Sequence, residues 1–439
     1  MIRPASAVAA LLAIALTVGV SSATSGTGTP ADPSGAPGGS PGASDSPPPP
    51  YPLASGAAVH RPHEVFGFLP YWSMGDWTDA YLRYDLLTTI AFFGVGQRDD
   101  GSLLRSGPGY TAYMSDQATT IIDHAHAAGV RTVITFESFG ASHNHKFLSN
   151  PVARTRFVTD AIALMTERGA DGANLDTETL AAADRPAWGL LVGEFASAAH
   201  RADPAAQVSV AVNGNVSGAR MASVALAAGA DRAFLMGYSY RVGASPTSGS
   251  ISPLSGTGTS LDLGTSLDLY AVNGVPPDQI ILGLPYYGMT WATVSGDLNA
   301  PRQPDSAGFG RGVAFRPRVL ATSGGPQTGV KVDHDMLEVS ARYAWYDPAK
   351  GTWLQTYFDD PTTLGLKEHL AVDRGLAGVG IWALGDDAGV PGYWETIAAT
   401  IFGGPPYVAP PTPSPGTSPD GSAGSSPGGS PGGSLGGSP

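Results

Sequence analysis

The residues best suited to chemistry stand in the segment from Asp171 to Glu178, which reads Asp-Gly-Ala-Asn-Leu-Asp-Thr-Glu. If residues 172–177 form a β-strand, the side chains of Asn174, Asp176 and Glu178 share one face, because successive side chains of a strand alternate between faces. Polar groups crowded at the carboxyl end of a core strand are typical of an active site. A helix N-cap at Asp176 or Glu178 accounts for one carboxylate, but not for three aligned polar groups.

The elements that position these residues are eight short apolar runs, separated mostly by segments with helical patterns. The runs are residues 65–71, 88–95, 132–136, 172–177, 208–212, 233–238, 280–286 and 378–384. Eight strands alternating with helices in one body of this size favour a (β/α)8 TIM barrel over a doubly wound sheet. The fold class predicted for residues 63–402 is therefore α/β.

Capping residues mark several of the intervening helices. Ser115 precedes one helix that ends at Gly129, and Asn150-Pro151 opens another that ends at Gly169. Further helices are expected after Asp184-Arg-Pro186 and from Pro361 to Arg374, before Gly375. Asp171 has the opposite parity to the three polar residues of its strand, so we expect it to point outward and to brace the preceding turn.

One connection is too long for a single helix. Residues 291–357 contain two apolar runs, 343–346 and 353–358, joined by Asp-Pro-Ala-Lys-Gly, a sequence typical of a hairpin turn. We therefore expect a small α+β insertion between barrel strands seven and eight. Since βα loops lie at the catalytic face of a barrel, the insertion is expected to form one wall of a substrate groove, unless it is only a stabilising flap.

Both ends of the chain differ in composition from this body. Arg3, the apolar residues 7–20 and the small residues 21–23 predict an export signal over residues 1–23. As a helix, the apolar run would cover about 21 Å, less than the ~30 Å core of a bilayer, so a cleaved signal is favoured over a membrane anchor. Residues 24–62 and 403–439 are rich in Ser, Gly and Pro and are expected to be disordered linkers or spacers.

Composition excludes several classes of protein. The chain has 439 residues, 24 Lys plus Arg and 37 Asp plus Glu, and its net charge of −13 argues against a nucleic-acid partner. Hydrophobic residues make up 42% of the chain, which is enough for a large core. The absence of cysteine excludes disulfide scaffolds, thiol catalysis and thiolate metal sites.

Taken in order, several motifs resemble glycoside hydrolase family 18, the chitinases and N-acetylglucosaminidases. Its strand-four signature, D-x-x-D-x-D-x-E, stands here as Asp171, Asn174, Asp176 and Glu178. The segments that resemble the first, sixth, seventh and eighth strands of the family are Gly67-Phe-Leu-Pro-Tyr-Trp72, Met236-Gly-Tyr-Ser239, Gly283-Leu-Pro-Tyr-Tyr-Gly288 and Ile381-Trp382. The Asn-x-Asp-x-Glu ending is closest to peptidoglycan-hydrolase and di-N-acetylchitobiase-like members.

The resemblance implies a secreted enzyme that cleaves β-1,4 bonds after N-acetylglucosamine, in chitin oligomers or in peptidoglycan. It implies a retaining mechanism in which the 2-acetamido oxygen of the substrate attacks the anomeric carbon. Glu178 would be the general acid and then the base, Asp176 would orient the acetamido group, and Tyr238 would donate its hydroxyl to the acetamido oxygen. The residues expected to bind substrate are Asn174, Trp382, Met236, Tyr71 and Tyr286.

Departures from the family pattern keep alternatives open. Asn174 and Ser239 replace residues that are usually Asp. Because of Ser239, a lectin that binds N-acetylated sugars without cleaving them is the rival interpretation. Glu137 offers a further carboxylate and permits a double displacement with Glu137 as the nucleophile. Chitin or peptidoglycan as substrate, exo or endo action, and the oligomeric state are left open.

No cofactor or metal is expected. His143 and His145 have a spacing that could bind a metal, but no carboxylate-rich pattern completes the set and the family uses no catalytic metal. We interpret them as surface or groove-lining histidines. After cleavage of the signal no membrane partner is expected, and the protein is predicted to be extracellular, with cell-wall association an alternative.

Overall fold

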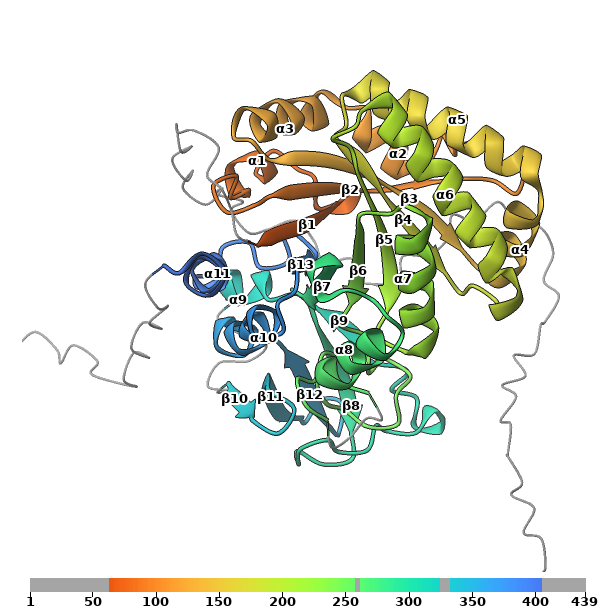
Figure 1. Ribbon diagram of the computed structural model, residues 1–439. Coiled ribbons are helices and arrows are strands. Elements are labelled where there is room, and N and C mark those ends of the chain that lie inside the picture. The colour runs from red at the N-terminus through yellow and green to blue at the C-terminus, as the bar shows by residue number, and fades with distance from the viewer. Residues whose placement is uncertain (1–62, 257–260, 324–331, 405–439) are drawn as a thin grey trace, which may run out of the picture. The chain divides into compact units, whose positions relative to one another are not determined.

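The computed structural model describes residues 63–256, 261–323 and 332–404 (Figure 1). The predicted signal peptide (1–23), the linker (24–62) and nearly all of the predicted tail (403–439) lie outside these residues. Among the residues described, no helix combines the length and the apolar character needed to cross a membrane.

Eight parallel strands close into a barrel in the order β1-β13-β7-β6-β5-β4-β3-β2, which confirms the predicted (β/α)8 fold. Each strand falls on one of the eight predicted runs, with boundaries that differ by at most three residues. The barrel strands are β1 (Glu64–Pro70), β2 (Thr89–Gly96), β3 (Arg131–Phe139), β4 (Gly172–Glu178), β5 (Gln207–Asn213), β6 (Arg232–Met236), β7 (Ile280–Pro285) and β13 (Gly378–Trp382).

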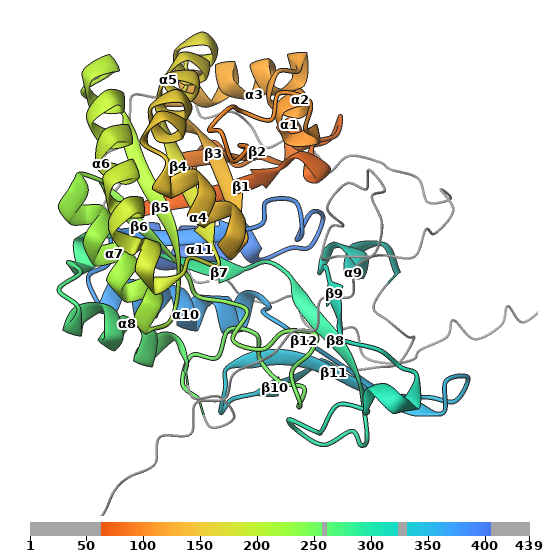
Figure 2. The same ribbon diagram turned by 90° about the vertical axis from the view of Figure 1, so that its right-hand side faces the viewer.

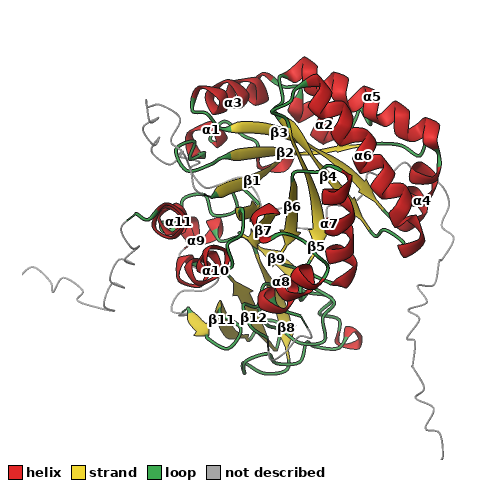
Figure 3. Ribbon diagram, viewed as in Figure 1, coloured by secondary structure: helices red, strands yellow, loops and turns green. Residues whose placement is uncertain are grey.

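Helices cover the outer side of these strands (Figure 3). They are α1 (Thr78–Tyr81), α2 (Pro108–Tyr113), α3 (Asp116–Ala127), α4 (Ala141–Ser149), α5 (Pro151–Arg168), α6 (Arg185–Ala202), α7 (Val216–Ala228), α8 (Leu263–Val272), α10 (Pro361–Asp373) and α11 (Tyr393–Phe402). The predicted caps of α3 and α5 are confirmed, because the side chains of Ser115 and Asn150 accept backbone N–H groups of the first turn. Gly169 ends α5 in the left-handed conformation.

Two separate apolar layers follow from the alternation of strand side chains. The layer inside the barrel contains Phe66, Phe68 and Phe234, while residues of opposite parity on the same strands pack against the helices. The ring of Phe234 occupies the space next to Gly283 and Gly380, where an added Cβ would approach ring atoms to 2.3 and 2.1 Å. Glycine is therefore required at both positions to admit the aromatic interior.

The predicted insertion between the seventh and eighth barrel strands is present and contains a five-stranded sheet in the order β10-β11-β12-β8-β9. The predicted hairpin is confirmed as β11 paired with β12 (Figure 2). The sheet begins three residues before the predicted start, because β8 follows β7 after only two residues. Its elements are β8 (Gly288–Thr293), β9 (Val313–Phe315), α9 (Arg318–Ser323), β10 (Asp333–Asp335), β11 (Ser340–Asp347) and β12 (Thr352–Phe358).

Candidate active site

Strand β4 carries the candidate acid–base residues on its inner face. Asn174 is fully buried and donates through Nδ2 to Ser209 Oγ of β5 at 2.9 Å. Asp176 is 5% exposed, and Glu178 ends the strand with a half-buried side chain. Leu175, of opposite parity, packs in the outer layer. The three polar residues therefore lie as their spacing predicted, and the carboxyl groups lie toward the open end of the strand.

A buried amide fixes the backbone at Glu178. Asn144 of α4 is fully buried, and its Nδ2 donates to the carbonyl oxygen of Glu178 at 2.6 Å. The same side chain accepts a hydrogen bond from Ser138 Oγ at 2.5 Å. The sequence analysis did not select Asn144, which lies between His143 and His145 within α4. No sequence signal marks it, because its role depends on a contact with Glu178 34 residues away.

A third carboxyl group, that of Glu137 on β3, joins Asp176 and Glu178. Burial first, and then the charges of Glu178 and Glu137, raise the pKa of Asp176 well above its usual range. Burial also raises the pKa of Glu178, and burial together with the charge of Glu178 raises the pKa of Glu137 to about 7. In the described part of the chain, no Lys, Arg or His forms an ion pair with any of the three. Burial and the mutual repulsion of like charges therefore oppose full ionisation of the three carboxyl groups.

Aromatic rings gather around Trp382 at the end of β13. Its ring centroid lies 4.7 Å from that of Phe93, 5.4 Å from that of Phe68 and 6.4 Å from that of Trp72. The ring of Tyr238 stacks on it at 6.5 Å. Trp72 is 38% exposed, so the cluster is open to solvent on one side. Such rings offer flat apolar faces beside the carboxyl groups.

Tyr238 belongs to this site, and Met236 lies beside the aromatic interior of the barrel. Burial, followed by the charges of Tyr287, Asp176 and Glu178, raises the pKa of Tyr238 well above its usual range, so its hydroxyl remains a donor. Tyr287 OH lies 2.9 Å from Ser239 Oγ. Ser239, which replaces the usual Asp, is therefore bound to a tyrosine that the sequence analysis did not select.

The structure does not bring Tyr286, one of the predicted substrate-binding residues, to the carboxyl groups. Tyr286 is 1% exposed, and its ring packs against Tyr393 of α11 at 5.1 Å. It has the outward parity of β7, so the following residue, Tyr287, lies at the inner side instead. Tyr71, the other predicted tyrosine, lies in the short turn Tyr71–Ser73 after β1, and its ring packs against that of Trp72 at 4.8 Å.

Asp171 points outward, as predicted, but it braces the start of the neighbouring strand β3 and not the preceding turn. Its Oδ2 accepts the backbone N–H of Thr132 at 2.7 Å and lies 2.9 Å from His126 Nε2.

The two histidines considered as metal ligands each contact a different aspartate. Nδ1 of His143 lies 2.6 Å from Asp99, and Nδ1 of His145 lies 2.7 Å from Asp184. The described residues contain no group of three or more His, Asp or Glu arranged to hold a metal.

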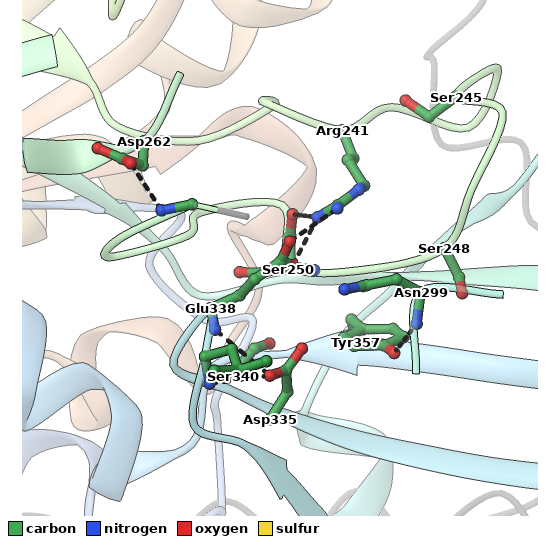
Figure 4. A network of polar contacts seen from close by, with 12 residues as sticks. Arg241, Ser245, Ser248, Ser250, Asp262, Asn299, Asp335, Glu338, Ser340 and Tyr357 are labelled. Carbon is green, nitrogen blue, oxygen red and sulfur yellow. Dashed lines mark hydrogen bonds and ion pairs between the residues drawn. The ribbon is translucent and has the colours of Figure 1, made fainter. Parts of the chain in front are cut away.

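A buried ion pair holds the insertion to the loop that follows β6 (Figure 4). Arg241 is 2% exposed and Glu338 is fully buried, and the guanidinium donates to both carboxylate oxygens at 2.6 and 2.7 Å. Glu338 also accepts the backbone N–H of Ser250 at 2.9 Å. Since the loop continues directly from Tyr238 and Ser239, this pair ties the insertion to the active-site rim.

Comparison with known proteins places the chain among its relatives. Di-N-acetylchitobiase of Rattus norvegicus is 24% identical over 345 residues, which cover 74% of this chain and 82% of that protein. Nod factor hydrolase protein 1 of Medicago truncatula is 26% identical over 254 residues, or 54% of this chain. The chain spans 64% of the latter protein, just under two thirds of its length.

Solved structures share the fold. The chitinase of Cycas revoluta in complex with (GlcNAc)3 matches with a TM-score of 0.62 at 20% identity, over 77% of this chain and 97% of that one. A Group IV chitinase of Ostrinia furnacalis in complex with allosamidin matches with a TM-score of 0.64 at 17% identity, over 78% and 98%. The profile of Glycosyl hydrolases family 18 matches residues 65–387. The chain therefore belongs to glycoside hydrolase family 18.

Proposed function

We propose that the protein hydrolyses β-1,4 bonds after N-acetylglucosamine in chitin oligomers or in peptidoglycan glycan strands. The observation that carries this proposal is the placement of Asp176 and Glu178 on the inner face of β4, beside the open aromatic cluster at Trp382. The names of the relatives agree with it, since they include a di-N-acetylchitobiase and chitinases bound to N-acetylglucosamine oligomers. The presence of Glu178 favours an enzyme over the lectin alternative.

In the proposed mechanism Glu178 is the general acid. Burial raises its pKa and so favours the protonated carboxyl group, which is the form that donates to the glycosidic oxygen. The acetamido oxygen bonds to the anomeric carbon as the glycosidic C–O bond breaks, and the proton of Glu178 passes to the leaving oxygen. The Glu178 carboxylate then takes a proton from water, which opens the bicyclic intermediate and restores the starting configuration.

Asp176 and Tyr238 act on the acetamido group in this mechanism. Asp176 accepts its N–H and stabilises the positive charge of the intermediate, while the Tyr238 hydroxyl donates to its oxygen before attack. Trp382 is the floor beneath the reacting sugar, because the C–H faces of a pyranose pack well on an aromatic ring. Trp72, which is more exposed, extends the aromatic surface at the same rim.

We also propose that the protein acts outside the cell. The support is the sequence of residues 1–23, with Arg3 before an apolar run and small residues. Comparison of the culture medium with the cell fraction, together with the N-terminal sequence of the protein found there, tests this. An intact N-terminus in the cell fraction alone would contradict export.

The function is tested by incubating the protein with chitotetraose and with purified peptidoglycan and analysing the products by mass. Cleavage of only one of the two identifies the substrate class. Substrate assistance predicts that the β-anomer appears first and that fully deacetylated oligomers are not cleaved. Rapid hydrolysis of deacetylated oligomers would instead favour Glu137 as the nucleophile, and release of no product from either polymer would contradict hydrolysis.

A further inference from the structure

Glu137 lies on the inner face of β3, directly beside Asp176. The two residues are in register across the β3–β4 pair, so their backbones are neighbours in adjacent strands, about 4.8 Å apart. On β3, Val133 packs inside the barrel, whereas Ile134 and Phe136 pack in the outer layer. The parity of Val133 extends to Glu137, which places its carboxyl group with those of Asp176 and Glu178.

Strand β2 leaves room for this carboxyl group. A Cβ built on Gly94 would lie 3.2 Å from Cδ of Glu137, so the absence of a side chain at position 94 lets the carboxyl group lie against the backbone of β2. From β2, only apolar residues and glycine face Glu137 over residues 93–96. The groups that titrate around it are Asp176 and Glu178 of β4, with Tyr238 and Tyr287 beyond them.

The charges around Glu137 are all of one sign. His143 of the nearby helix α4 is engaged by Asp99, and none of the ion pairs among the described residues includes Glu137, Asp176 or Glu178. Full ionisation would place three negative charges in a partly buried space without a cation. Because repulsion between like charges is mutual, each carboxylate opposes the ionisation of the others.

We propose that Glu137 is a positioning residue for the acid Glu178: its carboxyl group, on the neighbouring strand, opposes ionisation of the Asp176–Glu178 pair and so favours the protonated form of Glu178. The inference rests on the proposed function, in which Glu178 is the acid. It assigns to Glu137 an electrostatic action through Glu178 and no bond to the sugar, unlike the double displacement considered from the sequence.

The test is the pH dependence of kcat/KM on an aryl chitobioside for the wild type and for Glu137→Gln. Loss of the neighbouring charge eases ionisation of Glu178, so the basic limb of the profile is expected to move toward acid by about half to one pH unit. Glu368→Gln is the matched control. Its carboxyl group is also buried, with a pKa raised to about 8, but it lies on α10 in the helix layer. That variant is expected to keep the wild-type profile.

A second readout needs no substrate. With ¹³C at the glutamate carboxyl carbons, Glu137 and Glu178 of the wild type are expected to titrate in two coupled steps, each sensing the other. Substitution of either residue then assigns the resonances. If the wild type cleaves no N-acetylglucosamine substrate, the proposed function fails, and this titration still decides whether the two carboxyl groups are coupled.

An unmoved basic limb in Glu137→Gln, whatever its rate, would overturn the proposal, as would single-step and independent titration of the two resonances. A rate that falls equally at every pH would assign Glu137 to the chemistry itself, as a nucleophile requires. A displaced limb with coupled titration supports the positioning role.

Discussion

The two ends of strand β4 treat their carboxylates differently. At the amino end, Asp171 accepts a backbone N–H of β3 and pairs with His126. At the carboxyl end, Asp176 has a buried oxygen without a hydrogen-bond partner, and Glu178 has no cation beside it. The amino end satisfies its charge and stabilises the barrel. At the carboxyl end, burial without a neighbouring cation raises the pKa values of the carboxyl groups that acid catalysis uses.

The arrangement at the amino end is repeated two strands further on. Asp231, at the start of β6, accepts the backbone N–H of Val208 at 2.7 Å and lies 3.0 Å from His200 Nε2. The repetition indicates a structural device of the barrel, since the same contacts recur far from the carboxyl groups of the active site. The residues that stabilise the fold and the residues that perform the reaction thus lie at opposite ends of the strands.

The largest effect is expected at the carboxyl end. Glu178→Gln removes the proton donor but keeps the shape, so turnover of chitotetraose should fall on the order of 10²-fold or more. The melting temperature should not fall, because no paired charge is lost. Turnover by the variant should be partly restored with an aryl substrate that has a good leaving group. Turnover of chitotetraose at the wild-type rate would remove Glu178 from the mechanism.

At the amino end we expect the opposite outcome, a loss of stability without a loss of activity. Asp171→Ala leaves the buried N–H of Thr132 without its acceptor, and the free energy of unfolding should fall by about 1–3 kcal/mol. Asp231→Ala, which removes the matching brace, should behave in the same way. Urea unfolding measures both losses, and kcat/KM of the folded proteins should equal that of the wild type. A loss of activity without a loss of stability would erase the distinction between the two ends.

The carboxyl end should also make stability depend on pH. Glu137 has a folded pKa of about 7 against an ordinary value of 4.5, so between these values the unfolded chain binds fewer protons and stability falls as pH rises. We expect the free energy of unfolding of Glu137→Gln, measured against that of the wild type, to be about 1–2 kcal/mol more favourable to the variant at pH 8 than at pH 4. The effect is no larger because the side chain is partly exposed. Urea unfolding at both pH values measures it. An equal difference at pH 4 and pH 8 would contradict the buried proton.

The smallest effect is expected at Asn174. Asn174→Asp adds a carboxylate two residues from Asp176 on the same face, which should displace the pH profile of kcat/KM by less than about one unit while activity is largely retained. Asn174 donates to Ser209, so Ser209→Ala separates loss of this hydrogen bond from the added charge. Superimposable profiles for Asn174→Asp and the wild type would show that position 174 is electrically remote from the acid pair.

The barrel and its acid segment were predictable because both follow from a regular period. Residues of a strand alternate, so the positions of Asn174, Asp176 and Glu178 on one face follow from spacing alone. On β7 the same rule, carried past the strand end from Ile281, places Tyr287 and not Tyr286 on the inner side. It does not extend from β1 to Tyr71 and Trp72, because the chain turns there into the short helix Tyr71–Ser73.

Other features of the site have no period to reveal them. Asn144 acts through the carbonyl of Glu178, 34 residues away along the chain, and Arg241 meets Glu338 across 97 residues. Such pairings depend on how an irregular loop and an insertion fold against each other, which local sequence does not encode. The elevated pKa of Glu137 also depends on the tertiary structure, because it arises first from burial and then from the charge of Glu178 on another strand.

The Arg241–Glu338 pair has a consequence for engineering. Loop exchange between family members is a common route to new specificity, and the insertion, which has its own sheet, is an obvious segment to exchange. Deleting the insertion would leave the Arg241 guanidinium beside the active-site rim without its carboxylate partner. Removal of one partner of a buried ion pair lowers stability by about 3–5 kcal/mol. A transplant that carries residues 239–256 together with the insertion moves both charges at once. In this protein, the loop after β6 and the insertion form a single graftable unit.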